Sequence, residues 1–361
     1  MSFDPIVYME WAKAGTRASI NLARSGLPGL EFSDLGLNLR LEDLRINGDH
    51  PYGWAPLIEA IAARYGVDPE CVVPTVGTSQ AIFIACAALM GNGDGAYVEK
   101  PAYEPLRSVP RSLGGVLHRF NRLFERGFSI DSGEFEERFP EGAKVVLLSN
   151  LHNPSGVLLA PETIEQIAQA AARRGAILVI DEVYREFELR TGPLTSFGLA
   201  DNIMTISSLT KVFGLSGLRC GWMLVPRPMI RRVRQVVDNL HVEHVFPAEQ
   251  ISARIFPLLD VLKEKNRGWI EANKAVVRQF IQETPRLEWV EPDAGIVAFP
   301  RVAGVSGADA PGDRLARRLI ENGDTAVVPG SFFEDGRHIR LGFGLQGDDL
   351  RRGLDRVRAA L

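Results

Sequence analysis

The sequence predicts an α/β protein with a large domain, whose mostly parallel sheet is of the seven-stranded type and is flanked by helices, plus a smaller α+β domain. First, apolar β-rich segments alternate with helical patterns from about residue 56 to 225, which is typical of α/β layers. Second, three of these segments are near-continuous apolar runs, as in strands buried on both faces. Third, the C-terminal part changes to short strands around one helix.

The expected elements follow from these patterns in chain order. Strands are predicted at 71–77, 95–99, 115–120, 143–150, 176–182 and 203–208. Helices are predicted at 79–91 and 161–175, and a long helical region begins at 226–240 and continues through 250–281. In the smaller domain we expect strands at 295–300, 325–330 and 338–344, and helices at 312–323 and 348–361.

The length of 361 residues favours two domains. Residues 1–45 are predicted to form an N-terminal arm and part of the small domain. Residues 46–245 form the large domain and 246–361 the small C-terminal domain. We find no internal repeat and no low-complexity linker.

Composition excludes several classes of protein. The net charge is −4, and no basic run indicates nucleic acid or a membrane surface. The longest apolar stretch, which begins at Ala81, is far shorter than the roughly 20 residues of a membrane span. The start of the chain lacks a cationic segment, so we expect no signal peptide. Three widely spaced cysteines argue against a disulfide framework, so we expect a cytoplasmic protein.

Polar residues follow the predicted strands, where ligands of open α/β sheets bind. They are Gly77, Thr78 and Ser79 after the first strand, Asn153 after the fourth, Asp181 and Tyr184 after the fifth, and Ser208, Lys211 and Arg219 after the sixth. Taken alone, the glycine and hydroxyls are also explained by ordinary helix capping. Asp181 ends an apolar strand, where a carboxylate is costly without a cation. It therefore indicates a bound cationic group.

These residue types match the needs of pyridoxal phosphate. The cofactor requires an amine for its aldehyde, an acid for its pyridinium nitrogen, donors for its phenolate oxygen, a phosphate cradle and a group lying flat on the ring. Lys211 stands in "SSLTKVFGLSGLRCGW", a stretch of small residues that makes a poor helix. A surface lysine needs no such surroundings, so we interpret Lys211 as the cofactor-binding amine.

The motifs "GTSQAI", "PAY", "NLHNPSG", "DEVY", "SSLTKVFGLSGLRCGW" and "RHIRLGFG" occur in this order. With them the chain resembles the fold-type I pyridoxal-phosphate-dependent aminotransferases of class I/II over essentially its whole length. The resemblance implies that residues 46–245 bind the cofactor. It also implies a homodimer whose active sites are shared between subunits.

The resemblance assigns a role to each motif residue. Lys211 forms the internal aldimine, and Asp181 pairs with the ring nitrogen; with Tyr184 these are the implied catalytic residues. Asn153 and Tyr184 bond the phenolate oxygen, and Tyr103 stacks on the ring. The implied phosphate ligands are Thr78, Ser79, Ser208, Arg219 and, from the neighbouring subunit, Tyr52. Arg340 binds the substrate carboxylate as a planar fork, with Asn153 and Gly26 also at the substrate.

The predicted activity is the transfer of an amino group between an amino acid and a 2-oxo acid. A lyase or decarboxylase of the same fold is the alternative, because substrate orientation decides which Cα bond breaks. Arg340 favours a retained α-carboxylate. The sequence contains no distinctive second arginine for a dicarboxylate substrate, so the substrate stays open.

Three histidines carry open hypotheses. His241 and His244 are spaced i, i+3, but no third ligand cluster accompanies them, so we expect no metal. By position in the family they lie, with Phe246, where a partner subunit lines the substrate pocket. His152 either faces the substrate or holds its own loop together.

Overall fold

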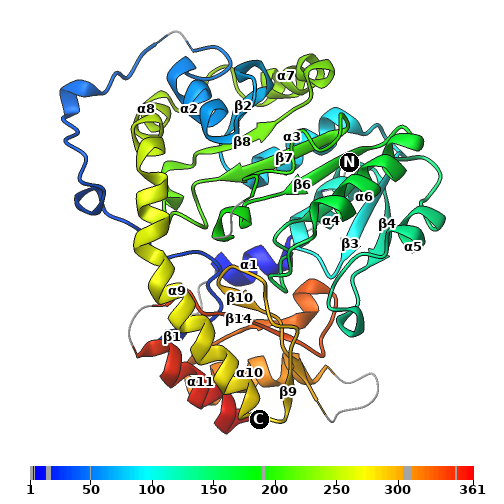
Figure 1. Ribbon diagram of the computed structural model, residues 1–361, viewed down its shortest axis with the longest axis vertical. Helices are drawn as coiled ribbons and strands as arrows, with labels where there is room; N and C mark the ends of the chain where they lie inside the picture. Colours follow the sequence, from blue (N-terminus) through cyan, green and yellow to red (C-terminus); the bar gives the residue numbers. More distant parts are fainter. Residues whose placement is uncertain are drawn as a thin grey trace.

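In the computed structural model the chain has two parts, a large sheet layered with helices and a C-terminal α+β part (Figure 1). The structure describes residues 3, 5–13, 18–48, 50–188, 192–303, 310–345 and 348–361. Within these ranges, no helix is both long and apolar enough to cross a membrane.

The large sheet has seven strands in the order β2-β8-β7-β6-β5-β3-β4. They are β2 (Val72–Thr75), β3 (Gly95–Lys100), β4 (Val116–Asn121), β5 (Ala143–Ser149), β6 (Ile177–Asp181), β7 (Ile203–Ser208) and β8 (Gly221–Leu224). The pairings from β4 through β7 are all parallel, whereas β8 runs antiparallel to both of its neighbours, β2 and β7. The predicted mostly parallel sheet is confirmed.

Helices cover both faces of this sheet. One face packs α3 (Thr78–Leu89), α4 (Glu104–Ser112) and α7 (Ile230–Leu240) into one apolar cluster, and the other packs α5 (Ser132–Glu137) and α6 (Pro161–Arg173) into a second. At the β2 edge, α2 (Ala55–Tyr65) packs against α8 (Phe246–Ile255). Strands β5 and β6 are almost wholly buried, which explains their continuous apolar sequences.

Strand β8 is the one element of the large sheet that the sequence analysis missed. Its four residues follow the glycine-rich lysine segment directly, so no periodic pattern marks it. A Cβ atom on Gly221 would lie 2.6 Å from the Cα atom of Gly77, so the backbone of β8 is in close contact with the loop that follows β2. This close approach brings the segment after Lys211 back beside the first predicted cofactor loop.

The C-terminal part is built from short strands and three long helices. Its strands are β9 (Leu287–Glu288), β10 (Val297–Ala298), β11 (Arg301–Val302), β12 (Thr325–Ala326), β13 (Val328–Pro329) and β14 (Ile339–Gly342). Its helices are α9 (Leu259–Gln282), α10 (Pro311–Gly323) and α11 (Asp349–Ala360). The predicted strand 325–330 is two strands, because the chain leaves one sheet after β12 and joins β14 through β13. The predicted helix 250–281 is likewise two, α8 and α9, with Pro257 in a 3-10 turn between them.

The N-terminal segment belongs spatially to the C-terminal part. Strand β1 (Ile20–Asn21) pairs in parallel with β12, and the Gly342 amide donates a hydrogen bond to the Leu22 carbonyl. The short helix α1 (Val7–Lys13) lies where the two parts meet (Figure 1). Residues far apart in the chain are thereby placed together at this junction.

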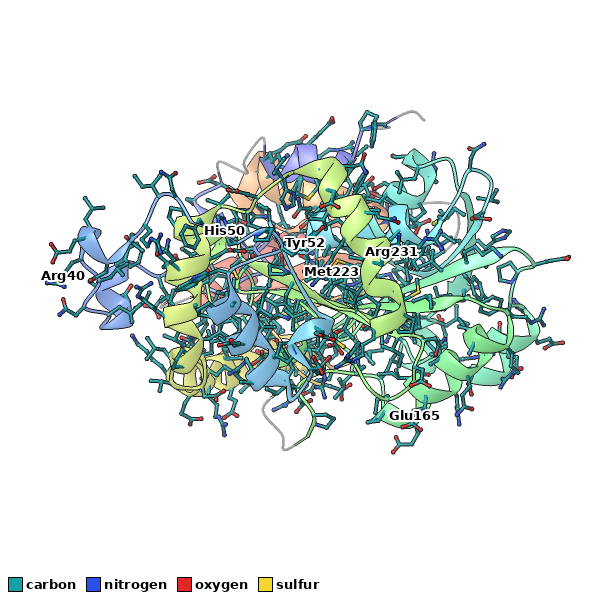
Figure 2. All side chains as sticks on the ribbon, turned by 90° about the horizontal axis from the view of Figure 1, so that it is seen from above. Arg40, His50, Tyr52, Glu165, Met223 and Arg231 are labelled. Carbon is teal, nitrogen blue, oxygen red and sulfur yellow. The ribbon has the colours of Figure 1, made fainter. Side chains whose placement is uncertain are left out.

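An arm follows β1 and carries two 3-10 helices, Phe32–Leu35 and Leu41–Asp43. It extends away from the body, with Arg40 at its outer end and His50 and Tyr52 back against the body (Figure 2). Its inner end is fastened to α8, because Gln250 exchanges hydrogen bonds with both backbone groups of Arg45.

Candidate active site

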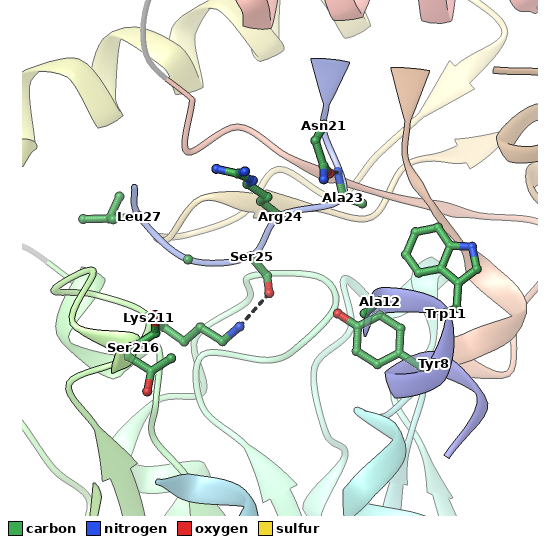
Figure 3. A pocket seen from close by; sticks show the side chains of 12 residues that line it. Tyr8, Trp11, Ala12, Asn21, Ala23, Arg24, Ser25, Leu27, Lys211 and Ser216 are labelled. Atoms are coloured by element: carbon green, nitrogen blue, oxygen red, sulfur yellow. Dashed lines mark hydrogen bonds between the residues drawn. The ribbon is translucent and has the colours of Figure 1, made fainter. Parts of the chain in front are cut away.

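Most of the predicted cofactor-binding residues lie at or after the carboxyl ends of β5, β6 and β7, or at the N-terminus of α3. Parallel strands bring their carboxyl ends to one edge, so residues distant in sequence gather there. A cavity of about 300 Å³ opens at this edge. Its walls come from α1, the segment 21–27 and the lysine loop, as Figure 3 shows.

Lys211 lies in the loop after β7 with its amine turned toward the segment 21–27 (Figure 3). Its Nζ donates a hydrogen bond to Ser25 Oγ over 3.0 Å, and its carbonyl accepts one from the Leu27 amide. A Cβ atom on Gly26 would come within 3.3 Å of Lys211 Cδ. A larger residue at position 26 would therefore press on the lysine side chain.

Asp181 ends β6 and is buried. Burial raises the pKa of its carboxyl to about 7, although a hydrogen bond from the Val183 amide to Oδ1 opposes the shift. The described residues supply no ion pair to this carboxylate. A cationic group beside Asp181 would restore the charged form of this carboxyl, and the predicted pairing with a cation stays a prediction.

Tyr103 lies near both Tyr184 and Asp181. Burial raises the pKa of Tyr103 well above its usual value, and the neighbouring Tyr184 and Asp181 raise it further, whereas a hydrogen bond with Ser79 lowers it. Tyr184 is buried and stacks on Phe187 with ring centroids 6.2 Å apart. The structure thus brings together the predicted ring-stacking tyrosine, the second tyrosine and the buried acid.

The predicted phosphate ligands surround the start of α3. Gly77 precedes this helix with φ +91°, and no side chain caps the free amides of its first turn. Arg219 donates from Nη2 to the Val76 carbonyl over 3.1 Å, so its guanidinium lies across this loop. Thr78 and Ser79 begin the helix, and the buried Ser208 ends β7. Free amides, hydroxyls and a guanidinium together suit an anion.

Arg340 on β14 is completely buried and holds the loop after β5. Its Nη1 donates to Asn153 Oδ1 over 3.1 Å, and its Nη2 donates to the Ala23 carbonyl over 3.0 Å. The predicted carboxylate-binding pair is therefore in mutual contact.

Tyr52 stands apart from the other predicted ligands in the same chain. Its hydroxyl donates to Asp238 Oδ2 over 3.4 Å, and the Arg234 guanidinium covers its ring at 4.6 Å. Figure 2 places Tyr52 near His50. These contacts of Tyr52 are with α7 and not with the predicted phosphate ligands of its own chain.

The histidines have local partners. His152 is buried, its pKa is lowered well below the usual value by burial, and its ring contacts Ser155 Oγ at 2.6 Å and the Pro101 carbonyl at 3.0 Å. The neutral ring therefore donates to Pro101 and accepts from Ser155. His241 and His244 contact each other over 3.4 Å. In the described part of the chain, no three His, Cys, Asp or Glu side chains form a metal-binding group.

The sequence analysis missed a buried network behind Asn153. Glu99 at the end of β3 accepts from Arg122 Nη1 over 2.9 Å and from the Ser149 hydroxyl over 2.6 Å. Ser149 Oγ in turn accepts a hydrogen bond from the Asn153 backbone amide over 3.0 Å. Neither side chain of this charged pair is exposed, and Arg122 Nη2 has no partner among the described residues, so the pair is costly to bury. Through Ser149 it is connected to the backbone of the Asn153 loop.

The site fits pyridoxal phosphate on several independent structural grounds. The buried carboxylate of Asp181 suits a cationic ring nitrogen, and the Lys211 amine is held at the cavity wall. A Cβ atom on Gly77 would lie only 2.6 Å from Arg219 Nη2, so a side chain there would displace the guanidinium from the loop. The fold and this donor set define a fold-type I pyridoxal-phosphate enzyme.

Comparison with known proteins narrows this class. The family model for aminotransferase class I and II matches residues 47–357. The chain belongs to that family, and it is a pyridoxal-phosphate-dependent aminotransferase.

The individual relatives named here share at most 28% sequence identity with this chain. The aspartate aminotransferase of Streptomyces avermitilis is 28% identical, covering 86% of this chain and 81% of the relative. The capreomycidine synthase of Streptomyces vinaceus is 27% identical, covering 96% and 90%. A pyridoxal-phosphate-dependent aminotransferase structure from Streptococcus suis has a TM-score of 0.92 at 23% identity, covering 100% of this chain and 98% of that one, and shows the shared fold.

Proposed function

We propose that this aminotransferase acts on 2-amino acids, with Lys211 holding the cofactor and Arg340 binding the substrate's α-carboxylate. The observation that carries the proposal is that the Lys211 amine and the Arg340–Asn153 pair lie at the same junction between the two parts of the chain. An α-amino acid presents its amino group and its carboxylate on one carbon, so it can meet both groups together.

The residue roles follow from their chemistry. When bound, pyridoxal phosphate supplies an aldehyde that takes up the amino group and a ring that accepts electrons from Cα. Asp181 keeps a positive charge on the ring nitrogen, and Tyr103 packs against the ring. The start of α3 and Arg219 hold the phosphate, helped by Thr78, Ser79 and Ser208. Asn153 and Tyr184 bond the phenolate oxygen.

Lys211 has a second proposed role when its amine is not bound to the cofactor. The amine could then take a proton from the substrate Cα, and Ser25 Oγ, 3.0 Å from Nζ, would hold the amine at the cavity wall. The bulk of the substrate side chain then lies in the cavity beside Trp11, Ala12 and Leu27.

Two further features belong to the proposal. We expect a homodimer in which Tyr52 reaches the phosphate of the partner's cofactor, since it lies outside the phosphate loop of its own chain. The cytoplasmic location is supported by three free, buried cysteines, of which Cys86 and Cys220 have thiol pKa values raised to about 12 by burial.

A half-reaction tests the function. The purified protein, loaded with pyridoxal phosphate, is mixed in single turnover with a panel of amino acids while cofactor absorbance and released products are measured. We expect stoichiometric 2-oxo acid and pyridoxamine phosphate. Release of carbon dioxide, ammonia or a cyclised product with the pyridoxal form regenerated would instead support the lyase or synthase alternative, which the similarity to a synthase keeps relevant.

The central residue has its own test. Lys211→Ala should bind pyridoxal phosphate without the absorbance of the covalently held form, and it should convert no amino acid. Covalent attachment that persists in Lys211→Ala would contradict the assignment.

A further inference from the structure

Tyr8 on α1 is buried at the cavity wall, next to both Lys211 and Arg340, and none of the roles above uses it. Its amide donates to Glu104 Oε2 over 2.7 Å, and Glu104 is itself buried. Its ring packs against four aromatic rings with centroids 5.8 to 6.4 Å away: Trp11, Tyr103, Phe332 and Phe333. Packing on several sides fixes the direction of the phenol.

The Tyr8 hydroxyl meets the arginine that is proposed to bind the carboxylate. Arg340 Nη2 donates to Tyr8 Oη over 3.0 Å. The remaining bonds of this guanidinium go to Asn153 and the Ala23 carbonyl, and Nε has no partner among the described residues. Tyr8 is therefore one of three groups that orient a fully buried cation. Loss of its oxygen would leave a buried donor unpaired, which is costly.

The hydroxyl also faces the lysine. Figure 3 shows it turned toward Ser25 and Lys211, the pair joined by the 3.0 Å hydrogen bond. Burial alone would raise the pKa of Tyr8, but the charges of Arg340 and Lys211 and hydrogen bonds with Arg340 and Ser25 outweigh it, so the pKa lies below its usual value. A string of polar groups thus connects the arginine to the lysine.

We propose that Tyr8 is a positioning residue for the α-carboxylate of the substrate: its hydroxyl holds the Arg340 guanidinium in the orientation that receives the carboxylate. This inference rests on the proposed function and deepens it. The N-terminal helix α1 is then part of the substrate site, although Tyr8 precedes Arg340 by 332 residues in the chain.

Tyr8→Phe tests the inference, because phenylalanine keeps the ring contacts and removes only the hydroxyl. We measure KM and kcat for the best amino acid of the panel. We also measure the dissociation constant of its 2-methyl analogue, which lacks the Cα proton, from the absorbance of the bound cofactor. Tyr8→Phe should raise KM and this constant about tenfold or more, as for a lost hydrogen bond to a charged group, and change kcat much less.

Two controls separate positioning from structure. Tyr97→Phe removes the hydroxyl of another buried tyrosine, which packs among Phe120, Phe135 and Phe139 on the face of the large sheet that α5 and α6 cover. This variant should change neither KM nor the dissociation constant of the analogue. In an Arg340→Lys background, Tyr8→Phe should add little further loss of binding, because its effect passes through Arg340. Melting temperature and cofactor content verify that each variant is folded.

The outcomes are distinct. An analogue dissociation constant within about twofold of wild type in Tyr8→Phe would overturn the inference, as would full additivity with Arg340→Lys. A fall in kcat with unchanged binding would also overturn it, by assigning Tyr8 to proton transfer. If the wild-type protein converted no amino acid, the proposed function would fail first and this inference with it.

Discussion

Asp181 combines two opposing effects in one side chain. Its burial at the end of β6 disfavours the charged form and raises the pKa to about 7, yet the proposed chemistry needs a carboxylate beside the cofactor ring. The bound cation would restore the charge, so the residue costs stability in the cofactor-free protein and serves the loaded enzyme. Such conflicts between stability and function are common at active sites.

Asp181→Asn should therefore stabilise the cofactor-free protein at alkaline pH. The folded carboxyl has a raised pKa, so the folded chain binds more protons than the unfolded chain between the usual value of 3.8 and about 7. Its contribution to the free energy of unfolding is complete at low pH and is lost as the pH rises to about 7. We expect the stability advantage of the variant to grow by about 2–3 kcal/mol between pH 5 and pH 8.

Denaturant unfolding of the cofactor-free proteins at the two pH values measures this difference. Asp201→Asn, at an exposed position before β7, is the matched control and should show no such trend. A pH-independent gap for Asp181→Asn would contradict the prediction. The loaded variant should nonetheless transaminate about 10²- to 10³-fold more slowly, because it lacks the charge opposite the ring nitrogen.

Single residues were predictable from sequence where their position relative to a strand end was itself informative. Lys211 and Asp181 follow strands that are evident from their apolar runs. Tyr8 and Ser25 were missed because nothing local marks them. Their partners, Arg340 and Lys211, lie 332 and 186 residues away, and only the folded chain brings them together.

At the scale of one element, Gly77 lets the Arg219 guanidinium approach the N-terminus of α3, where we propose that the cofactor phosphate binds. The glycine adopts φ +91°, a conformation that other residues rarely take. The guanidinium fills the space where a side chain would be. The helix amides and the arginine can thus act on the same phosphate.

Gly77→Ala should weaken pyridoxal phosphate binding by about tenfold or more, because displacing Arg219 removes a charge-assisted hydrogen bond. Gly66→Ala is the matched control. That glycine also has a positive φ, +65°, and no atom lies within 4 Å of an added Cβ, so it tests a positive φ without the clash. Its left-handed helical conformation strains alanine less than the conformation of Gly77 does. Titration of cofactor-free protein, followed by absorbance, gives both dissociation constants. Equal affinities in the two variants would show that the arginine contact is unimportant.

The predictability of an element depended on its length and burial. Long apolar strands such as β5 and β6 were predicted almost to the residue. Strand β8 was not, since its four residues pair in the antiparallel direction and follow glycine-rich sequence. Helix α4 begins with proline at its second position and contains Pro110, so its sequence resembles a loop. Pairing partners and tertiary packing supply what these sequences lack.

At the scale of the whole molecule, apolar side chains remain exposed on two adjoining segments. Leu41 and Ile46 on the arm are 88% and 83% exposed, and Val242, between α7 and α8, is 85% exposed. Arg45, the neighbour of Ile46, is bonded to Gln250 of α8, so the inner end of the arm lies beside α8. Exposed apolar side chains that gather on one surface mark protein interfaces. This exposure supports the proposed homodimer. The division of the chain into residues 1–45, 46–245 and 246–361 is a separate proposal.

Subunit complementation tests whether the active sites are shared. Tyr52→Phe should lower activity about tenfold by removing a hydrogen bond to the cofactor phosphate, and Lys211→Ala should abolish it. When the two variants are co-expressed with different tags, a mixed dimer has one site that combines the intact Lys211 of one chain with the intact Tyr52 of the other. Random pairing makes half of the dimers mixed, so the preparation should recover about a quarter of wild-type activity per site from them.

The matched control pairs Lys211→Ala with Asp181→Asn. Both residues lie at the strand ends of the same chain, so every site of their mixed dimer lacks one of the two and no activity should return. Recovery of activity in the Tyr52 pairing, without recovery in the Asp181 pairing, requires that Tyr52 acts in the partner's site and that Asp181 acts in the site of its own chain. No recovery in the Tyr52 pairing, with mixed dimers isolated through both tags, would mean that Tyr52 serves its own subunit. In that case the contacts of Tyr52 with Asp238 and Arg234 would have to rearrange when the cofactor binds.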